Sequence, residues 1–167
     1  MRRGAGAAVA SLVILGLVGA AAIFAPLLSP ADPIKNDLLE RLTPPMWSAG
    51  GSAAHPLGTD TLGRDVLSRL LYGARVSLVV GFVTVIAAGA AGVALGVLGG
   101  FYGGWLDDVL MRTGDVQLAF PVLLLGVAML SVLGPGLGNL VLVLALSGWI
   151  TYARIVRGET LSLRQRE

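Results

Sequence analysis

Four long runs of apolar residues, separated by polar segments, set the pattern along this chain. They cover residues 5–28, 76–102, 116–133 and 137–153, and none of them contains a charged residue. A helix rises about 1.5 Å per residue and the hydrocarbon core of a bilayer is about 30 Å thick, so roughly 20 apolar residues cross it. The pattern therefore predicts an all-α integral membrane protein with four transmembrane helices, of which the fourth is the shortest.

The overall composition supports a membrane protein. Of the 167 residues, 55% are hydrophobic and 13% are charged, whereas a soluble domain carries about 25% charged residues. A chain of this size cannot hide so much apolar surface in one water-soluble core, so its main neighbour is expected to be membrane lipid. The basic residues are dispersed or lie at the ends of the apolar runs, which argues against a nucleic-acid partner.

The first run follows Arg2 and Arg3, a pattern shared by secretory signal peptides and membrane anchors. The apolar core of a signal peptide usually has about 7–15 residues, and this run is longer and is followed by others. We therefore expect residues 1–28 to be a retained transmembrane anchor rather than a cleaved signal.

Basic residues near the ends of the runs predict the orientation. They are Arg2 and Arg3 before the first run and Arg154, Arg157, Arg164 and Arg166 after the fourth, opposed there by Glu159 and Glu167. Four crossings return the chain to its starting side, so both basic ends are expected in the cytoplasm. Residues 29–75 are then extracytoplasmic, and "GGWLDDVLMRTGD" (103–115) is a cytoplasmic loop. The "GPG" at 134–136 predicts a tight turn between antiparallel helices.

Small residues recur every four positions in the second run. They are Ala88, Gly92, Gly96 and Gly100, and this spacing places them on one helix face. Such a face lets another helix backbone approach closely, so we expect a packing seam in a multi-helix bundle. The alternative is that these glycines only reflect a glycine-rich chain, since 24 of the 167 residues are Gly.

Several kinds of chemistry are disfavoured by the residues present. The runs carry no ionisable group of the kind that proton relays and ion-selective pores place at membrane depth. The only lysine, Lys35, lies outside any P-loop pattern. There is no cysteine and no plausible nucleophile–base pair, so we expect no catalytic residue, no cofactor and no metal site. The only histidine, His55 beside Pro56, is most simply a surface or turn residue.

The polar segment before the second run contains an amphipathic pattern. Leu62, Val66, Leu67, Leu70 and Leu71 share one face of a helix, opposite Asp65, Ser68, Arg69 and Tyr72. We expect a short helix capped by Asp60 or Thr61, supported by an Asp65–Arg69 pair and ended at Gly73, before Arg75 marks the start of the next span. This helix is either a plain connector or a structured element over the mouth of a translocation path.

The sequence resembles the permease subunits of bacterial ABC importers. "HPLGTDTLGRDVLSRLLYGARVSLVVG" (55–81) is the most specific stretch, with "SPADP" (29–33), "GGFYGGWLDDVLMRTGDVQLAFPVLLL" (99–125) and "ITYARIVRGETLSLRQRE" (150–167). The resemblance is to the family for dipeptides, oligopeptides and nickel, and within it to the C-type subunit. It implies the type I ABC importer permease fold, with residues 76–167 as part of the permease domain and four of six expected spans present.

The resemblance also implies partners and a location. Such a subunit lies in the bacterial inner membrane and pairs with a homologous second permease subunit to form the solute pathway. Two cytoplasmic ATPase subunits hydrolyse ATP, and an extracytoplasmic solute-binding protein delivers the solute, so this chain would not itself be an enzyme.

In this family the segment like "RGETLSLRQRE" is followed by an EAA…G loop, which docks into the ATPase, and by two more spans. Without that loop, we expect the chain to insert in the membrane but not to couple to ATP hydrolysis. Arg154, Arg157 and Glu159 flank this element and are candidates for a role in coupling, the simpler interpretation being that they anchor a helix end at the interface. The alternatives to an importer subunit are a small structural or assembly membrane protein, a non-coupled fragment, and a passive channel.

Overall fold

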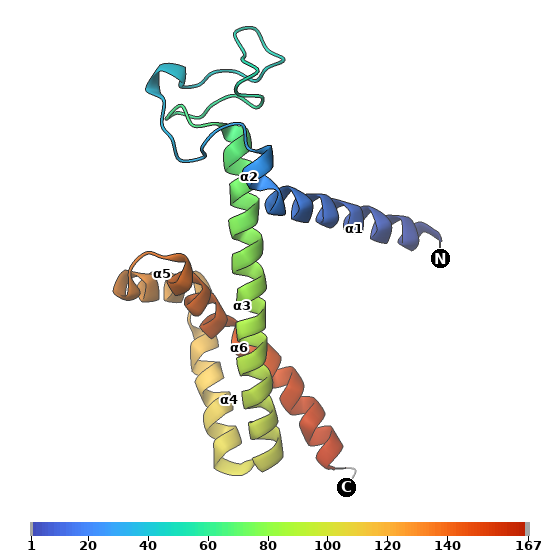
Figure 1. The fold of residues 1–167 in the computed structure, drawn as a ribbon. Coiled ribbons are helices and arrows are strands. Elements are labelled where there is room, and N and C mark those ends of the chain that lie inside the picture. The colour runs from blue at the N-terminus through green and yellow to red at the C-terminus, as the bar shows by residue number, and fades with distance from the viewer. Residues whose placement is uncertain (1, 166–167) are drawn as a thin grey trace. The chain divides into compact units, whose positions relative to one another are not determined.

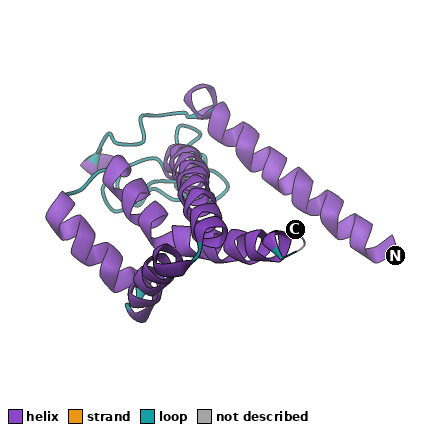
Figure 2. Cartoon of the chain, turned by 90° about the horizontal axis from the view of Figure 1, so that it is seen from below, coloured by secondary structure: helices purple, strands orange, loops and turns teal. Residues whose placement is uncertain are grey.

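The computed structural model describes residues 2–165, with side chains described from residue 6, and that part of the chain consists of helices and loops (Figures 1 and 2). It divides into two compact units, Met1–Val79 and Val80–Glu167. One long helix, α3, belongs to both. The all-α prediction is therefore confirmed.

The first unit begins with α1 (Arg2–Ile23) and α2 (Ala25–Leu28). The predicted run 5–28 is thus broken at Phe24, and Pro26 lies in the first turn of α2, where its missing N–H costs no helical hydrogen bond. Residues Gly6–Ile23 are long and apolar enough to cross a membrane. The side chains of Arg2 and Arg3, and residues Arg166 and Glu167, lie outside the described part.

The connection between α2 and α3 contains only the short 3-10 helix η1 (Leu38–Glu40). Two stretches of this connection, 37–46 and 56–62, run beside each other. The backbone N–H groups of Asp37, Leu42 and Met46 donate to the carbonyls of Leu62, Asp60 and Pro56 at 3.1–3.2 Å. These bonds satisfy backbone groups that no helix or sheet serves.

Gly63 permits this close pairing. Its φ is +72°, a conformation that other residues adopt at a cost. A Cβ atom at this position would lie 1.6 Å from the carbonyl oxygen of Asp37. The glycine is therefore required both by its own backbone and by its neighbour.

The helix α3 (Val66–Tyr102) is continuous over 37 residues (Figure 1). The prediction of a separate amphipathic helix that ends at Gly73 is therefore wrong. Gly73 lies inside α3, where a Cβ would meet nothing within 4 Å, and the amphipathic stretch from Val66 onward forms the first turns of the long helix.

The predicted cap and the predicted ion pair are also wrong. Asp65, rather than Asp60 or Thr61, caps α3, because its Oδ2 accepts from the N–H of Ser68 at 2.6 Å. Arg69 pairs with Asp60 instead of Asp65. Asp60 Oδ1 closes the preceding turn by accepting from the N–H groups of Leu62 and Arg64, and Asp60 Oδ2 pairs with Arg69.

The second unit contains the rest of α3 followed by α4 (Gly104–Ala119), α5 (Val122–Leu133) and α6 (Leu137–Arg164). A single residue, Gly103 with φ +64°, separates α3 from α4. The predicted loop 103–115 is thus mostly helix. The charges of this stretch suggested a loop, but two of its carboxylates, Asp107 and Asp115, pair with arginines of α6.

The predicted third span, 116–133, is not one straight helix. Phe120 takes an extended conformation before Pro121, and α4 and α5 meet at an angle of 95°. Within residues 2–165, three helices are long and apolar enough to cross a membrane, or up to four if α4 and α5 form one broken crossing. The predicted fourth run begins α6, which continues well beyond it.

The predicted turn at 134–136 is confirmed. Gly134 and Gly136 have φ values of +84° and +158°, and Asn139 Nδ2 donates to the carbonyls of Leu133 and Gly134 at 2.8 and 3.1 Å. The turn returns the chain so that α5 and the first part of α6 pack side by side.

Replacing Gly63 with Ala should destabilise the first unit by more than about 1 kcal/mol, because alanine is strained at positive φ and its Cβ would collide with the carbonyl of Asp37. The matched control is Gly73→Ala, which should be neutral or stabilising by about 0.5–1 kcal/mol because alanine favours helix. Thermal unfolding of the detergent-solubilised chain measures both. Equal stability of the two variants would contradict the close approach.

Candidate functional site

The helices α3 and α6 meet at a close seam in the second unit. A Cβ atom at Gly92 would lie 2.4 Å from the Trp149 carbonyl oxygen, and one at Gly96 would lie 2.6 Å from that of Ala153. One at Gly100 would lie 2.8 Å from Thr160 Cβ. The three glycines therefore let the two backbones touch.

Ala88 extends the seam by one more turn. Its side chain is buried, and a Cβ atom at Gly148 of α6 would lie 3.3 Å from the Ala88 Cβ. All four small residues predicted on one face of the second run thus lie against α6. Later residues of α3 meet later residues of α6, so the two helices run in the same direction.

The helix α4 also packs against α6. A Cβ atom at Gly114 would lie 2.1 Å from Ile150 Cδ1, so this glycine leaves the space that the Ile150 side chain fills. Ile150 is 1% exposed and forms the core of this unit with Trp149 and Ala153. Leu95 from α3 and Met111 from α4 pack against this core.

Polar side chains connect α4 to α6 along their length. Trp149 Nε1 donates to Gln117 Oε1 at 3.0 Å, and Gln117 Nε2 donates to the Leu146 carbonyl at 2.7 Å. Arg154 pairs with Asp115 further along α6. Such bonds hold helices together where lipid supplies no hydrophobic force between them.

Among these connections between α4 and α6, the pair of Arg157 and Asp107 has the most favourable hydrogen-bond geometry. Arg157 donates through Nε to one carboxylate oxygen of Asp107 and through Nη2 to the other, a two-point pairing of planar groups. Asp107 is buried, although it lies near the start of α4. Since early α4 residues meet late α6 residues, these two helices are antiparallel.

Of the three polar residues predicted near the chain's C-terminal end, the structure therefore brings two into contacts. Arg154 and Arg157 pair with α4, whereas Glu159 is exposed. The sequence prediction missed their partners, Asp107 and Asp115. The sequence did carry a sign of a helix at this place, because Asp107, Met111 and Gly114 follow the spacing of one helix face.

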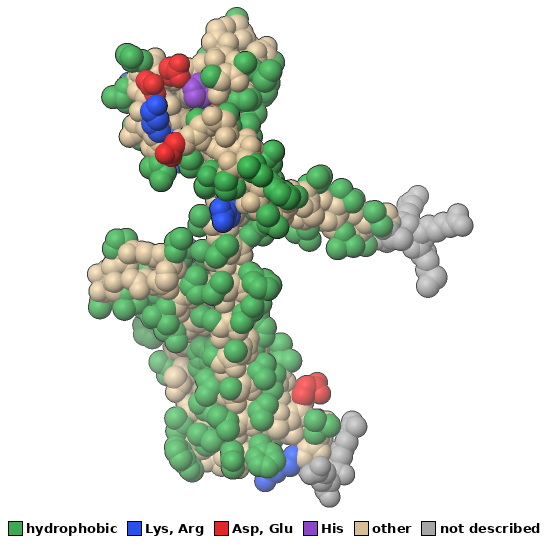
Figure 3. Space-filling view, viewed as in Figure 1, with side chains coloured by type: hydrophobic (Ala, Val, Ile, Leu, Met, Phe, Trp, Pro, Cys, Tyr) green, Lys and Arg blue, Asp and Glu red, His purple; other side chains and the backbone are tan. Residues whose placement is uncertain are grey.

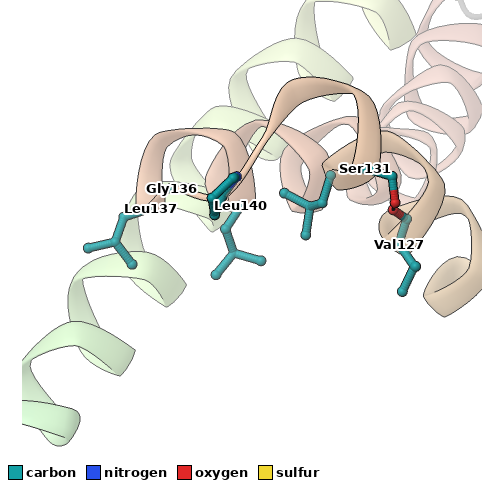
Figure 4. Close-up of a pocket in the computed structure, with 7 residues that line it drawn as sticks. Val127, Ser131, Gly136, Leu137 and Leu140 are labelled. Carbon is teal, nitrogen blue, oxygen red and sulfur yellow. Dashed lines mark hydrogen bonds between the residues drawn. The ribbon is translucent and has the colours of Figure 1, made fainter.

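A groove of about 680 Å³ lies between α5 and α6 near their turn (Figure 4). It is lined by Val127, Leu130, Ser131, Pro135, Gly136, Leu137 and Leu140. The only polar side chain among them, Ser131, donates its hydroxyl to the carbonyl of Val127. The groove therefore offers shape and apolar surface but no charge to an occupant.

A cluster of polar side chains precedes α3 in the first unit, where Figure 3 shows the single histidine among acidic and basic groups. His55 Nδ1 lies 3.0 Å from Asp65 Oδ1, and its Nε2 lies 2.7 Å from Glu40 Oε2. His55 is 8% exposed, so the prediction of a surface residue is wrong. It does lie in a turn, because its carbonyl accepts from the N–H of Gly58.

Hydrogen bonding controls the titration of this cluster. Burial lowers the pKa of His55, but the hydrogen bonds to Asp65 and Glu40, with their charges, raise it above 6.5 overall. Burial raises the pKa of Asp65, but bonds from Ser68 and His55 outweigh it and hold the pKa below 3.8. For Asp60, burial is outweighed by the N–H groups of Arg64 and Leu62 and by the Arg64 side chain, so its pKa falls to about 2.

Replacing Gly96 with Ala should destabilise the second unit by about 1–3 kcal/mol, the usual cost of overpacking. The added methyl group would press on the α6 backbone at Ala153. Gly89→Ala is the matched control, because it lies on the same helix with nothing within 4 Å. Thermal unfolding in detergent measures both variants, and an unchanged Gly96→Ala protein would rule out close contact at the seam.

Comparison with known proteins identifies two matching segments. Residues 92–167 match the family described as "Binding-protein-dependent transport system inner membrane component". Residues 6–45 match the "N-terminal TM domain of oligopeptide transport permease C". The first segment contains α4, α5, α6 and the glycines of the seam, and the second contains most of α1 and all of α2.

Individual relatives match almost the whole chain. The dipeptide transport system permease protein DppC of Haemophilus influenzae is 39% identical over 160 residues, covering 96% of this chain and 54% of the relative. The di/tripeptide permease DppC of Pseudomonas aeruginosa is 41% identical, with 96% and 53% covered. The nickel permease NikC of Escherichia coli is 40% identical, with 94% and 54% covered. The chain thus spans about half the length of these relatives.

Proposed function

We propose that this chain belongs to the family of binding-protein-dependent transport inner membrane components, whose models match residues 92–167 and 6–45, and that it acts as the C-type permease subunit of an ATP-driven importer. Its proposed solutes are peptides or related small molecules, because two relatives are named as dipeptide and di/tripeptide permeases. Nickel is the alternative, because a third relative is named as a nickel permease. The observation that carries the proposal is the match over 96% of the chain.

The proposed partners follow from the family. A homologous second permease subunit completes the pathway, two cytoplasmic ATPase subunits supply the energy, and an extracytoplasmic protein delivers the solute. The chain's own residues then have a mechanical role. The seam at Gly92, Gly96 and Gly100 joins α3 to α6, and the arginines of α6 fix it to α4, so the three helices form one body that can move as a unit.

Arg154 and Arg157 belong to that mechanical role. By pairing with Asp115 and Asp107 they fix the last turns of α6 against α4. Glu159, which is exposed on the same stretch, is available to a partner. We propose that this end of α6 transmits the movement of the ATPase subunits to the helices.

We propose that both chain ends face the cytoplasm of a bacterial inner membrane and that residues 29–75 lie outside. The parallel course of α3 and α6 supports this arrangement, because two parallel helices cross in the same direction and end on the same side. By the charge rule, the basic residues Arg154, Arg157 and Arg164 near the end of α6 support a cytoplasmic location for that side.

Cysteine labelling tests the orientation, since the chain has no cysteine of its own. Leu39→Cys and Leu163→Cys place a thiol at positions that are 97% and 63% exposed. In intact cells whose outer membrane is permeable, an impermeant maleimide should label the Leu39→Cys variant. It should label the Leu163→Cys variant only after the inner membrane is opened. The reverse result would invert the topology.

A chimera tests the function. The chain replaces the matching half of the Pseudomonas aeruginosa di/tripeptide permease in a strain that lacks that subunit, and dipeptide uptake is measured. Restored uptake that stops when the ATPase subunits are inactivated is the expected result. The matched controls are chimeras with Gly96→Ala, which should lose uptake, and with Gly89→Ala, which should keep it.

Two outcomes would contradict the proposal. Uptake that continues without active ATPase subunits would indicate a passive channel. A chimera that reaches the membrane at normal levels but neither transports nor co-purifies with the ATPase subunits would indicate an assembly or structural protein.

A further inference from the structure

The buried polar cluster before α3 connects three separate segments of the first unit. The hydroxyl of Ser68, which is fully buried in α3, accepts from the N–H of Ala31 at 3.2 Å and donates to Asp65 Oδ2 at 2.6 Å. The other oxygen of Asp65 contacts His55, and the far nitrogen of His55 contacts Glu40 on η1. One continuous chain of hydrogen bonds thus holds the segment after α2, η1 and the turn at His55 on the N-terminus of α3.

The protonation state of the His55 ring decides whether this series of hydrogen bonds is complete. A neutral imidazole carries one N–H, whereas the protonated ring carries two. Both ring nitrogens face a carboxylate, and ionised carboxylates only accept hydrogen bonds. Neutral His55 therefore satisfies one carboxylate and presents a lone pair to the other, while protonated His55 donates to both.

The charges around the ring also favour its protonated form. A cavity of about 120 Å³ beside His55 is lined by Ala31, Asp32, Lys35, Asp37, Glu40, His55, Gly63 and Asp65. These residues include four carboxylates and one lysine, so the surroundings are acidic on balance. The nearby arginines do not offset this, because Arg64 and Arg69 are paired with Asp60.

We propose that His55, with Asp65 and Glu40, forms a pH-dependent latch that holds residues 29–60 on the N-terminus of α3 in mildly acidic surroundings and loosens in alkaline ones. The position of η1, and with it the highly exposed Leu39, then depends on pH. The latch itself does not depend on the proposed transport function. That it senses the medium outside the cell rests on the proposed orientation.

The direction of the pH dependence follows from the shifts of two groups. The pKa of His55 is raised above 6.5 in the folded chain, so its contribution to stability is complete below that value and is lost as the pH rises through the raised pKa. The pKa of Asp65 is lowered, so its contribution is present above 3.8 and is lost as the pH falls through the lowered pKa. The latch is therefore tightest between these limits.

The first test measures the titration of the ring directly. His55 is the only histidine, so a chain labelled with ¹³C-histidine gives one imidazole signal in full-length, detergent-solubilised protein. That signal should titrate with a pKa above 6.5. In Glu40→Gln the pKa of His55 should be lower, and the half-exposed position of the Glu40 side chain tolerates this substitution. Glu159→Gln, exposed and in the other unit, is the matched control and should leave the titration unchanged.

The second test measures the opening of the latch. Hydrogen exchange of residues 55–68, corrected for the intrinsic pH dependence of exchange, should show protection that falls severalfold as the pH rises from about 6 to about 8.5, the range in which histidine changes charge. In His55→Gln the protection should be lower and independent of pH. A signal that titrates at or below 6.5, or the same pH dependence in both proteins, would overturn the proposal whether or not the chain transports peptides.

Discussion

The contact of backbone with backbone between α3 and α6 is the constraint on which the second unit depends. Inside a bilayer two helices gain little from apolar side chains alone, because lipid is equally apolar. They gain from close van der Waals contact, which requires that side chains be absent at the crossing. Gly92, Gly96 and Gly100 provide this absence at three successive turns, and α4 completes the unit with Gly114 and with its bonds to Trp149, Arg154 and Arg157.

The main features of the fold could be predicted from local pattern. Apolar runs predicted the membrane helices, four-residue spacing predicted the small face of α3, and "GPG" predicted the turn before α6. The boundaries were less predictable. The charges of 103–115 suggested a loop because the arginines that pair with Asp107 and Asp115 lie about 40–50 residues later in the chain. The break at Phe120, with its 95° angle, was not predicted, because the run 116–133 is apolar on both sides of Pro121.

The polar cluster of the first unit was the least predictable part. The stretch 55–81 was singled out as specific, yet the reasons for its residues lie elsewhere. The buried His55 has Glu40 and Asp65 within hydrogen-bond distance of its two nitrogens, and Gly63 is needed because the carbonyl of Asp37 lies against it. Each of these contacts joins residues 10–26 positions apart across irregular backbone, where no helical or strand period relates them.

The break between α4 and α5 has a consequence for hydration. The last carbonyl groups of a helix lack partners within it, and Pro121 has no N–H to offer. Hydrocarbon supplies no donors, so irregular backbone at membrane depth is tolerated only against other protein or against water. If α4 and α5 together form one crossing, the residues around Phe120 and Pro121 cannot face lipid. That short stretch then marks the side of the bundle that stays wet or is covered by a neighbouring subunit.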